Sequence, residues 1–233
     1  MRVLVTRPEP GASATARRLA ALGHAPLVMP LSETRPLAGQ TPPETVPNAV
    51  AVTSANALRH ADSRLLTSLL QTPCFAVGAR TADLAGEAGF KNVLAAGGDS
   101  RSLAATIGER LPAGAHIFYL CGRTRRCEFE QLLAAAGYAC TPLETYETRA
   151  LTPDPAILKR AGAVDCALVY SPNGARALAG LAGSDEFAPC FEKTQFLCLS
   201  PAVADALGRL GTQRVRVAGR PDEEALFALL PKG

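Results

Sequence analysis

The sequence predicts an α/β fold built from two similar parallel-sheet lobes. Apolar runs of about four to six residues alternate with helix-like stretches of about ten residues, which is typical of a parallel sheet with right-handed crossovers. The chain also repeats itself, because residues 3–31 align without a gap on residues 117–145. Two polar, Pro-rich stretches fall inside the repeats rather than between them, which determines how the two lobes are divided.

The first repeated segment fixes the order of the elements. Residues 3–31 and 117–145 each contain a short apolar strand, a polar turn carrying Arg, a helix, a Gly and a second strand. Gly23 falls on Gly137 in this alignment. Each segment is therefore expected to form one strand–helix–strand unit.

Two further pairs of segments continue the repeat. Residues 49–56 resemble residues 167–173, in both cases an apolar strand that runs into a polar turn and a helix. Residues 75–84 resemble residues 197–206, and each of these is followed by a helix, a Gly and the start of another strand. The duplication thus covers most of the chain and favours two flavodoxin-like lobes.

Residues with capping preferences mark the helix ends. Helices are expected to begin after Ser54 and Ser171, whose hydroxyls suit the N-cap position, and a third after Asp99 or Ser100. Three glycines stand where a left-handed residue ends a helix, namely Gly89, Gly137 and Gly211.

The polar stretches at residues 35–47 and 148–155 are the expected domain boundaries. One domain is then continuous, residues 36–148, and the other is discontinuous, residues 1–35 plus 149–233. Two connecting segments of this kind form a hinge, which suits closure of a cleft between the domains around a ligand.

Composition excludes several classes of partner and location. The formal net charge is +3 and no window is densely basic, so neither nucleic acid nor a membrane is expected as a partner. The apolar run at the start is too short for a signal peptide, and no stretch is long enough to span a bilayer. A cytoplasmic protein, favoured as a monomer, is expected.

The reactive residue types argue against metal and nucleotide chemistry. The seven Cys form no C-x-x-C pair and are expected to be small core residues, while the three His, at positions 24, 60 and 116, are expected in loops or on the surface. No metal site is therefore predicted. G-x-G-x-x-G after the first strand, the P-loop, H-E-x-x-H and G-x-S-x-G are all missing from the sequence.

The candidate ligand-binding residues lie in the turns that follow the predicted strands. In open α/β sheets ligands bind beyond the carboxyl ends of the strands, where helix N-termini offer free N–H groups to anions. Helix capping alone also explains the Ser, Thr and Asn residues, and helix-capping or surface roles also explain the Arg residues. The candidates are Arg7, Thr53, Ser54, Asn56, Thr81, Arg101, Arg126, Ser171, Asn173 and Ser200.

Tyr146 is the candidate catalytic residue. It lies where the second strand of its repeat meets the return linker, and a phenol there could donate a proton. Packing of the ring in a strand, with the hydroxyl in water, explains it as well.

Five motifs in register resemble the uroporphyrinogen-III synthase family over nearly the whole chain. They are Val-Thr-Arg-Pro at residues 5–8, Thr-Ser-Ala-Asn-Ala at 53–57, Phe-Ala-Val-Gly-Ala-Arg-Thr-Ala at 75–82, Tyr-Glu-Thr at 146–148 and Tyr-Ser-Pro-Asn-Gly at 170–174. The resemblance implies two α/β lobes joined by a two-stranded linker, the first lobe being built from both termini.

The resemblance also implies a cofactor-free reaction on a small-molecule substrate, hydroxymethylbilane, a linear tetrapyrrole with eight carboxylates. Loss of its hydroxyl gives an azafulvene cation, and a spiro intermediate then delivers the inverted last ring. Tyr146 matches the family's Tyr proposed to assist departure of the hydroxyl, while Thr81 and Ser171 match cleft residues. Val203 stands where some members have a Thr, which puts catalytic use of that position in doubt. A transient contact with the preceding enzyme of the pathway is also expected.

Two alternatives of other classes remain open from the residues alone. A two-lobed module that binds or senses a small anion without catalysis has the same double linker. A flavodoxin-like redox protein shares the predicted strand and helix order, and a bound flavin would distinguish it.

Overall fold

The computed structural model describes residues 1–42, 44–208, 210 and 212–231. The chain divides into two compact units: unit 1 is residues 1–33 with 149–233, and unit 2 is residues 34–148. None of the described helices is long and apolar enough to cross a membrane.

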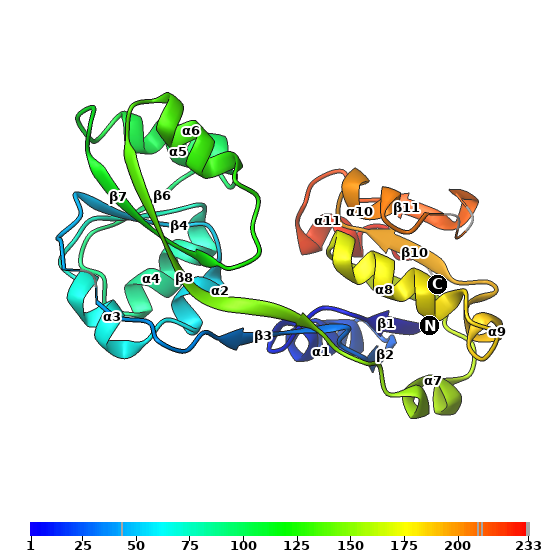
Figure 1. Ribbon diagram of the computed structural model, residues 1–233. Coiled ribbons are helices and arrows are strands. Elements are labelled where there is room, and N and C mark those ends of the chain that lie inside the picture. The colour runs from blue at the N-terminus through cyan, green and yellow to red at the C-terminus, as the bar shows by residue number, and fades with distance from the viewer. Residues whose placement is uncertain (43, 209, 211, 232–233) are drawn as a thin grey trace. The chain divides into compact units, whose positions relative to one another are not determined.

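Unit 1 is built on a parallel sheet whose described strands lie in the order β11-β10-β9-β1-β2 (Figure 1). The strands are β1 Arg2–Val5, β2 Ala25–Val28, β9 Cys166–Val169, β10 Gln195–Cys198 and β11 Val215–Val217. The helices are α1 Gly11–Ala21, α7 Pro155–Ala161, α8 Pro172–Ala182, α9 Ala188–Phe191, α10 Pro201–Asp205 and α11 Glu223–Phe227, with a 3₁₀ helix η1 Thr212–Arg214.

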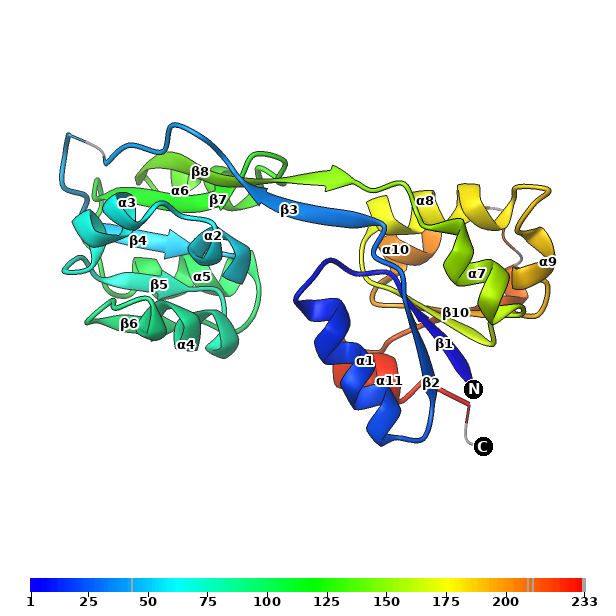
Figure 2. The same ribbon diagram turned by 90° about the horizontal axis from the view of Figure 1, so that it is seen from below.

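Helices cover both faces of the unit 1 sheet. Leu4 of β1 packs with α7, α8, α9 and α10 on one face, whereas Val3 and Val5 pack with α1 and α11 on the other. Helices α1 and α11 lie side by side although they come from the two ends of the chain (Figure 2). Burial on both faces explains why the strands are continuous apolar runs rather than alternating ones.

Unit 2 has the same construction with one additional edge strand, and its described strands lie in the order β3-β8-β7-β4-β5-β6. The strands are β3 Ser32–Pro36, β4 Ala49–Val52, β5 Cys74–Ala76, β6 Val93–Ala95, β7 His116–Gly122 and β8 Ala139–Ala150. The helices are α2 Ala55–Arg59, α3 Ser63–Leu69, α4 Ala79–Glu87, α5 Ser100–Gly108 and α6 Glu128–Ala135. Helices α5 and α6 cover one face of the sheet, and α2, α3 and α4 cover the other (Figure 1).

Strands β3 and β8 are neighbours in the sheet order and carry the chain past the division between the units. The Leu37 amide donates to the Thr145 carbonyl, and the Leu151 amide donates to the Leu31 carbonyl, each over 3.0 Å. Residue numbers increase from 31 to 37 in the first segment while those of their partners decrease from 151 to 145, so the two segments run antiparallel.

The repeated segments form corresponding elements. Strands β1 and β7 pair with β2 and β8 in the same register, Arg2 with Ala25 and His116 with Ala139. The spatial order of the two sheets is also the same, but the chain enters unit 1 at β1 and unit 2, after β3, at β4. The α/β class with parallel sheets is confirmed.

In each sheet the strand order reverses once, between β1 and β9 in unit 1 and between β4 and β7 in unit 2. We call the carboxyl ends of these strand pairs the unit 1 and unit 2 switch points. Ligands of open α/β sheets bind at such places. The two switch points are therefore the positions at which to look for a site.

The predicted helix starts are confirmed. The Ser54 hydroxyl accepts from the Asn56 amide at 3.2 Å and the Ser171 hydroxyl from the Gly174 amide at 3.1 Å. Of the two residues considered for the third helix, Asp99 is the cap, since its carboxylate accepts from the Ser102 amide at 2.7 Å. Two of the three expected glycines adopt positive φ, Gly89 at 104° and Gly137 at 81°, whereas Gly211 lies outside the described residues.

Two expectations were wrong in detail. Each polar stretch begins in a strand rather than in a linker, because β3 continues to Pro36 and β8 to Ala150. The cysteines are not all core residues: Cys127 is exposed and Cys140 and Cys190 are half-buried. Cys127 lies in the turn that precedes α6, at the N-cap position of that helix.

Candidate functional site

At the unit 2 switch point a β-bulge changes the direction of Tyr146. Strands β7 and β8 pair regularly up to Cys121 with Glu144, but the next pair is Gly122 with Tyr146, which leaves Thr145 without an opposite residue. The Thr145 side chain is fully buried and donates to the Ala57 carbonyl of α2 at 2.8 Å. Bulges beside functional sites commonly re-aim a side chain, and here two consecutive residues both face the α2 side of the sheet.

The re-aimed Tyr146 is half-buried and lies among groups of the same unit. Its hydroxyl donates to the Ser54 hydroxyl at 3.3 Å, while Ser54 also accepts the Asn56 amide as the N-cap of α2. Its ring lies close over Gly122, and the ring of His60 is 5.9 Å away between centroids, tilted by 35°. The unit thus places a phenol at the carboxyl end of the sheet, with its hydroxyl on a helix cap.

His60 lies in the turn that follows α2, so its expected loop position is confirmed. It is half-buried, and its Nε2 lies 2.8 Å from the Thr34 hydroxyl. Burial, together with the neighbouring Arg59 charge, lowers the pKa of His60, so the ring is neutral at neutral pH. Sequence alone gave no signal for its contact with Tyr146, because the two residues are far apart in the chain.

The remaining small polar candidates of unit 2 are largely bonded within the unit. The Thr53 hydroxyl lies 2.6 Å from the Tyr119 hydroxyl, and burial raises the pKa of Tyr119 to about 12. The Asn56 side-chain carbonyl accepts from Arg59 at 3.3 Å, and Thr81 is buried in the first turn of α4. Thr53 also lines a cavity of about 380 Å³ with residues 98–101 and Glu128.

Two predicted Arg residues of unit 2 remain open to a ligand. Arg101 is 81% exposed and only 3.5 Å from one Glu128 oxygen, and Arg126 is exposed with no hydrogen bond or ion pair to any residue that the structure describes. The other guanidinium groups of the same turn are engaged, since Arg123 pairs with Glu144 and Arg125 with Glu130 and Glu144. Cations for an anionic ligand are therefore available at the ends of α5 and α6.

The unit 1 switch point is organised around a carboxylate that sequence reasoning missed. One oxygen of Glu223, in α11, accepts from Arg7 at 2.9 Å, from the Tyr170 hydroxyl at 2.9 Å and from Thr15 at 2.5 Å. The other oxygen accepts from Arg18 at 2.6 Å. Burial opposes the charge, but the two hydroxyl bonds and the two guanidinium groups outweigh it and hold the pKa of Glu223 below its ordinary value.

Arg7 is consequently held by its own chain. Its guanidinium lies 4.5 Å from the Tyr170 ring centroid, pairs with Glu223 and is 23% exposed. Burial raises the pKa of Tyr170, which therefore stays protonated and donates to Glu223. Glu223 is 216 residues from Arg7 in sequence, and no local pattern marks such a pair.

The other unit 1 candidates lie at helix N-termini. Ser171 caps α8, and the Asn173 side chain accepts from Arg176 at 2.7 Å. Ser200 stands at the N-cap of α10, but its hydroxyl makes no capping bond. Val203, which replaces a family Thr, is 2% exposed and packs in the core.

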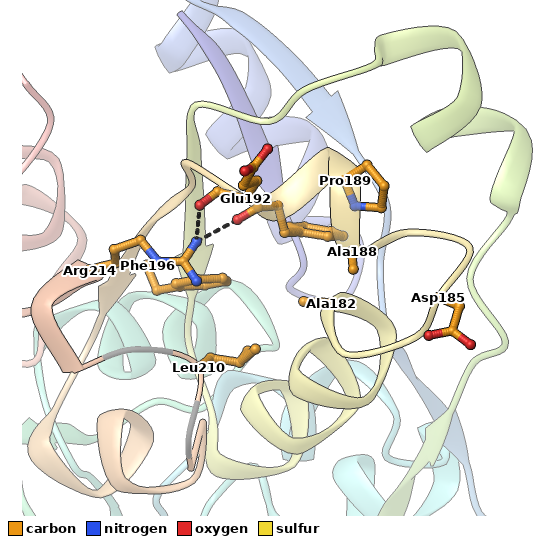
Figure 3. Close-up of a pocket in the computed structure, with 9 residues that line it drawn as sticks. Ala182, Asp185, Ala188, Pro189, Glu192, Phe196, Leu210 and Arg214 are labelled. Carbon is orange, nitrogen blue, oxygen red and sulfur yellow. Dashed lines mark hydrogen bonds between the residues drawn. The ribbon is translucent and has the colours of Figure 1, made fainter.

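Unit 1 also has a cavity of about 530 Å³ (Figure 3). It lies at the amino end of the sheet, opposite the switch point, beside the start of β10 and η1. Arg214 borders it, but this guanidinium donates to the Phe191 and Glu192 carbonyls at 2.5 and 2.7 Å. It also lies 5.7 Å from the Phe196 ring centroid. These contacts explain Arg214 as a group that fastens the turn before β10.

Comparison with known proteins agrees with this geometry. The model of the family described as uroporphyrinogen-III synthase HemD matches residues 13–228. A uroporphyrinogen-III synthase of Chlorobaculum parvum is 28% identical over 225 residues, which cover 90% of this chain and 89% of that protein.

Two solved structures share the fold. The crystal structure of uroporphyrinogen-III synthetase from Helicobacter pylori has a TM-score of 0.68 at 18% identity and covers 98% of both chains. A mutant uroporphyrinogen III synthase from Thermus thermophilus has a TM-score of 0.53 at 21% identity, covering 98% of this chain and 88% of that one. Because the family model matches nearly the whole sequence, the chain belongs to the uroporphyrinogen-III synthase family.

Proposed function

We propose that this chain is a lyase that cyclises hydroxymethylbilane to uroporphyrinogen III, with inversion of the last pyrrole ring and loss of water, in tetrapyrrole (haem) biosynthesis. The observation that carries the proposal is the match of the family model over residues 13–228. That match disfavours the alternative of a small-anion sensor without catalysis.

Tyr146 is the proton donor in this proposal. Its phenol, half-buried beside Ser54, protonates the hydroxyl of the substrate as that group leaves as water. The azafulvene cation is attacked by the substituted carbon of the last pyrrole to form the spiro intermediate, which fragments and recloses. The proton lost from the last pyrrole at reclosure returns to the phenolate, so the cycle closes without a cofactor.

In each unit, the turns at the carboxyl end of the sheet are the proposed binding positions for substrate carboxylates. Free N–H groups and the positive ends of helix dipoles favour anions there. In unit 2 these turns carry Arg101 and Arg126, which the chain leaves accessible. In unit 1 they are the N-termini of α8 and α10, with Ser171 and Ser200 at the N-cap positions. Holding a flexible tetrapyrrole in a folded conformation supplies much of the rate enhancement.

Incubation of the purified protein with freshly prepared hydroxymethylbilane tests the proposal. Chromatography of the oxidised products separates the inverted isomer III from the uninverted isomer I, which forms spontaneously. The enzyme is expected to yield mainly isomer III. A product that is isomer I alone, formed at the rate of the protein-free control, would contradict the proposal and restore the binding-module alternative.

A further inference from the structure

Gly122, the last residue of β7, faces the ring of Tyr146 across the bulge. We propose that Gly122 is a positioning residue, whose missing side chain leaves the space in which the Tyr146 phenol reaches Ser54. This inference rests on the proposed function, in which Tyr146 supplies the proton. It assigns a role to a residue that has no side chain of its own.

The space between Gly122 and the Tyr146 ring is too small for a side chain on residue 122. A Cβ added to Gly122 would lie 2.7 Å from Cζ of Tyr146 and 3.0 Å from both Cε2 and the hydroxyl oxygen. Real Cβ atoms essentially never approach heavy atoms this closely, so the ring would have to move. The backbone is no obstacle, because Gly122 is not among the glycines with positive φ. The ring can therefore keep its place only while residue 122 has no Cβ.

The strand that carries Tyr146 cannot easily follow the ring. The Tyr146 carbonyl accepts from the Arg123 amide at 2.8 Å, and the neighbouring Thr145 is fixed to the Ala57 carbonyl. The Gln40 side-chain amide also donates to the Thr145 carbonyl at 2.9 Å and to the His60 carbonyl at 2.8 Å. A new methyl group would thus displace the phenol relative to a fixed backbone.

The hydrogen bond from Tyr146 to Ser54, which orients the phenol, is sensitive to small displacements of the ring. At 3.3 Å, the distance from the Tyr146 hydroxyl to the Ser54 hydroxyl is already longer than the usual 2.7–2.8 Å. A shift of a few tenths of an ångström away from Ser54 breaks it. The proton donor would then be misplaced although all its atoms remain.

Four proteins test this inference: the unaltered chain, Gly122→Ala, Tyr146→Phe and the double variant. Gly122→Ala is expected to lower kcat about tenfold and to change KM by less than about twofold, because the phenol but not the carboxylate sites is disturbed. In the Phe background the same change is expected to cost nothing further. Gly86→Ala is the matched control, since a Cβ there meets no atom within 4 Å, and it should retain full turnover.

Full turnover of Gly122→Ala, or an equal loss with and without the Tyr146 hydroxyl, would overturn the inference. If Gly122→Ala does not fold, Gly122→Ala with Tyr146→Leu decides: recovery of folding supports the ring contact, and failure overturns it. Failure of the proposed function is a separate result, because the unaltered chain would then yield isomer I alone. A crystal structure of Gly122→Ala should show the Tyr146 hydroxyl beyond hydrogen-bond distance of Ser54.

Discussion

The two switch points share one sheet order but use their polar groups differently. In unit 1 the Glu223 carboxylate receives bonds from Arg7, Arg18, Thr15 and Tyr170, so charges and hydroxyls satisfy one another. In unit 2 the Tyr146 phenol donates one long hydrogen bond among the described residues, and the Arg101 and Arg126 guanidinium groups are exposed. With the function proposed above, two sheets of the same strand order would serve stability in unit 1 and chemistry in unit 2.

The largest effect is expected from a substitution that breaks the cluster of ion pairs and hydrogen bonds around Glu223 in unit 1. Glu223→Gln leaves Arg7 and Arg18 without their shared counter-charge in a partly buried place, and it should lower the free energy of unfolding by about 2 kcal/mol. Urea denaturation measures this loss. Glu224→Gln is the matched control: Glu224 also pairs with Arg18 but is 74% exposed, so its loss should be well under about 1 kcal/mol. Equal losses in the two variants would refute the special role of Glu223.

The next effect concerns catalysis in unit 2. Tyr146→Phe should reduce kcat about tenfold, equivalent to about 1.4 kcal/mol, and leave the free energy of unfolding nearly unchanged. Steady-state kinetics with hydroxymethylbilane gives the first quantity and urea denaturation the second. Unaltered turnover would show that Tyr146 only packs in its strand.

A smaller effect is the pH dependence of stability. Because the pKa of Glu223 is lower in the folded than in the unfolded protein, its contribution is present above the unfolded pKa and is lost as pH falls through the folded pKa. As the pH falls below the ordinary pKa of a Glu, about 4.3, the difference in unfolding free energy between the unaltered chain and Glu223→Gln should therefore shrink. A difference that stays constant as the pH falls would mean that ionisation of Glu223 does not stabilise unit 1.

The smallest expected effect concerns the exposed Arg side chains of unit 2. Arg126→Ala should raise KM about threefold without changing kcat, and the increase should diminish as salt screens the attraction for the substrate carboxylates. Lys91→Ala, an exposed cation before β6 at the amino end of the sheet, should leave KM unchanged. The same rise in both variants would indicate attraction by net charge rather than a site.

Local signals allowed much of the fold to be predicted from the sequence. Strand runs, the Ser54, Asp99 and Ser171 caps and the helix-ending glycines each depend on residues within a few positions. The bulge at Thr145 could not be predicted, because the buried bond to Ala57 from another element fixes it.

The candidate site was less predictable for the same reason. The position of Ser54 after β4 follows from element order, but Tyr146 lies within β8 and not where that strand meets a linker. The pairing of Arg7 with Glu223 and the contact of His60 with Tyr146 depend on tertiary packing. Sequence therefore indicated which turns to inspect but not which side chains are already engaged.

In the proposed mechanism the proton donor lies in unit 2, whereas the ionic cluster of unit 1 maintains the fold. Turnover per folded molecule, measured for Tyr146→Phe and Glu223→Gln under conditions in which both are folded, tests it most directly. We expect about a tenfold loss for Tyr146→Phe and less than about a twofold loss for Glu223→Gln. The reverse pattern, with Glu223→Gln inactive while folded and Tyr146→Phe fully active, would contradict the account.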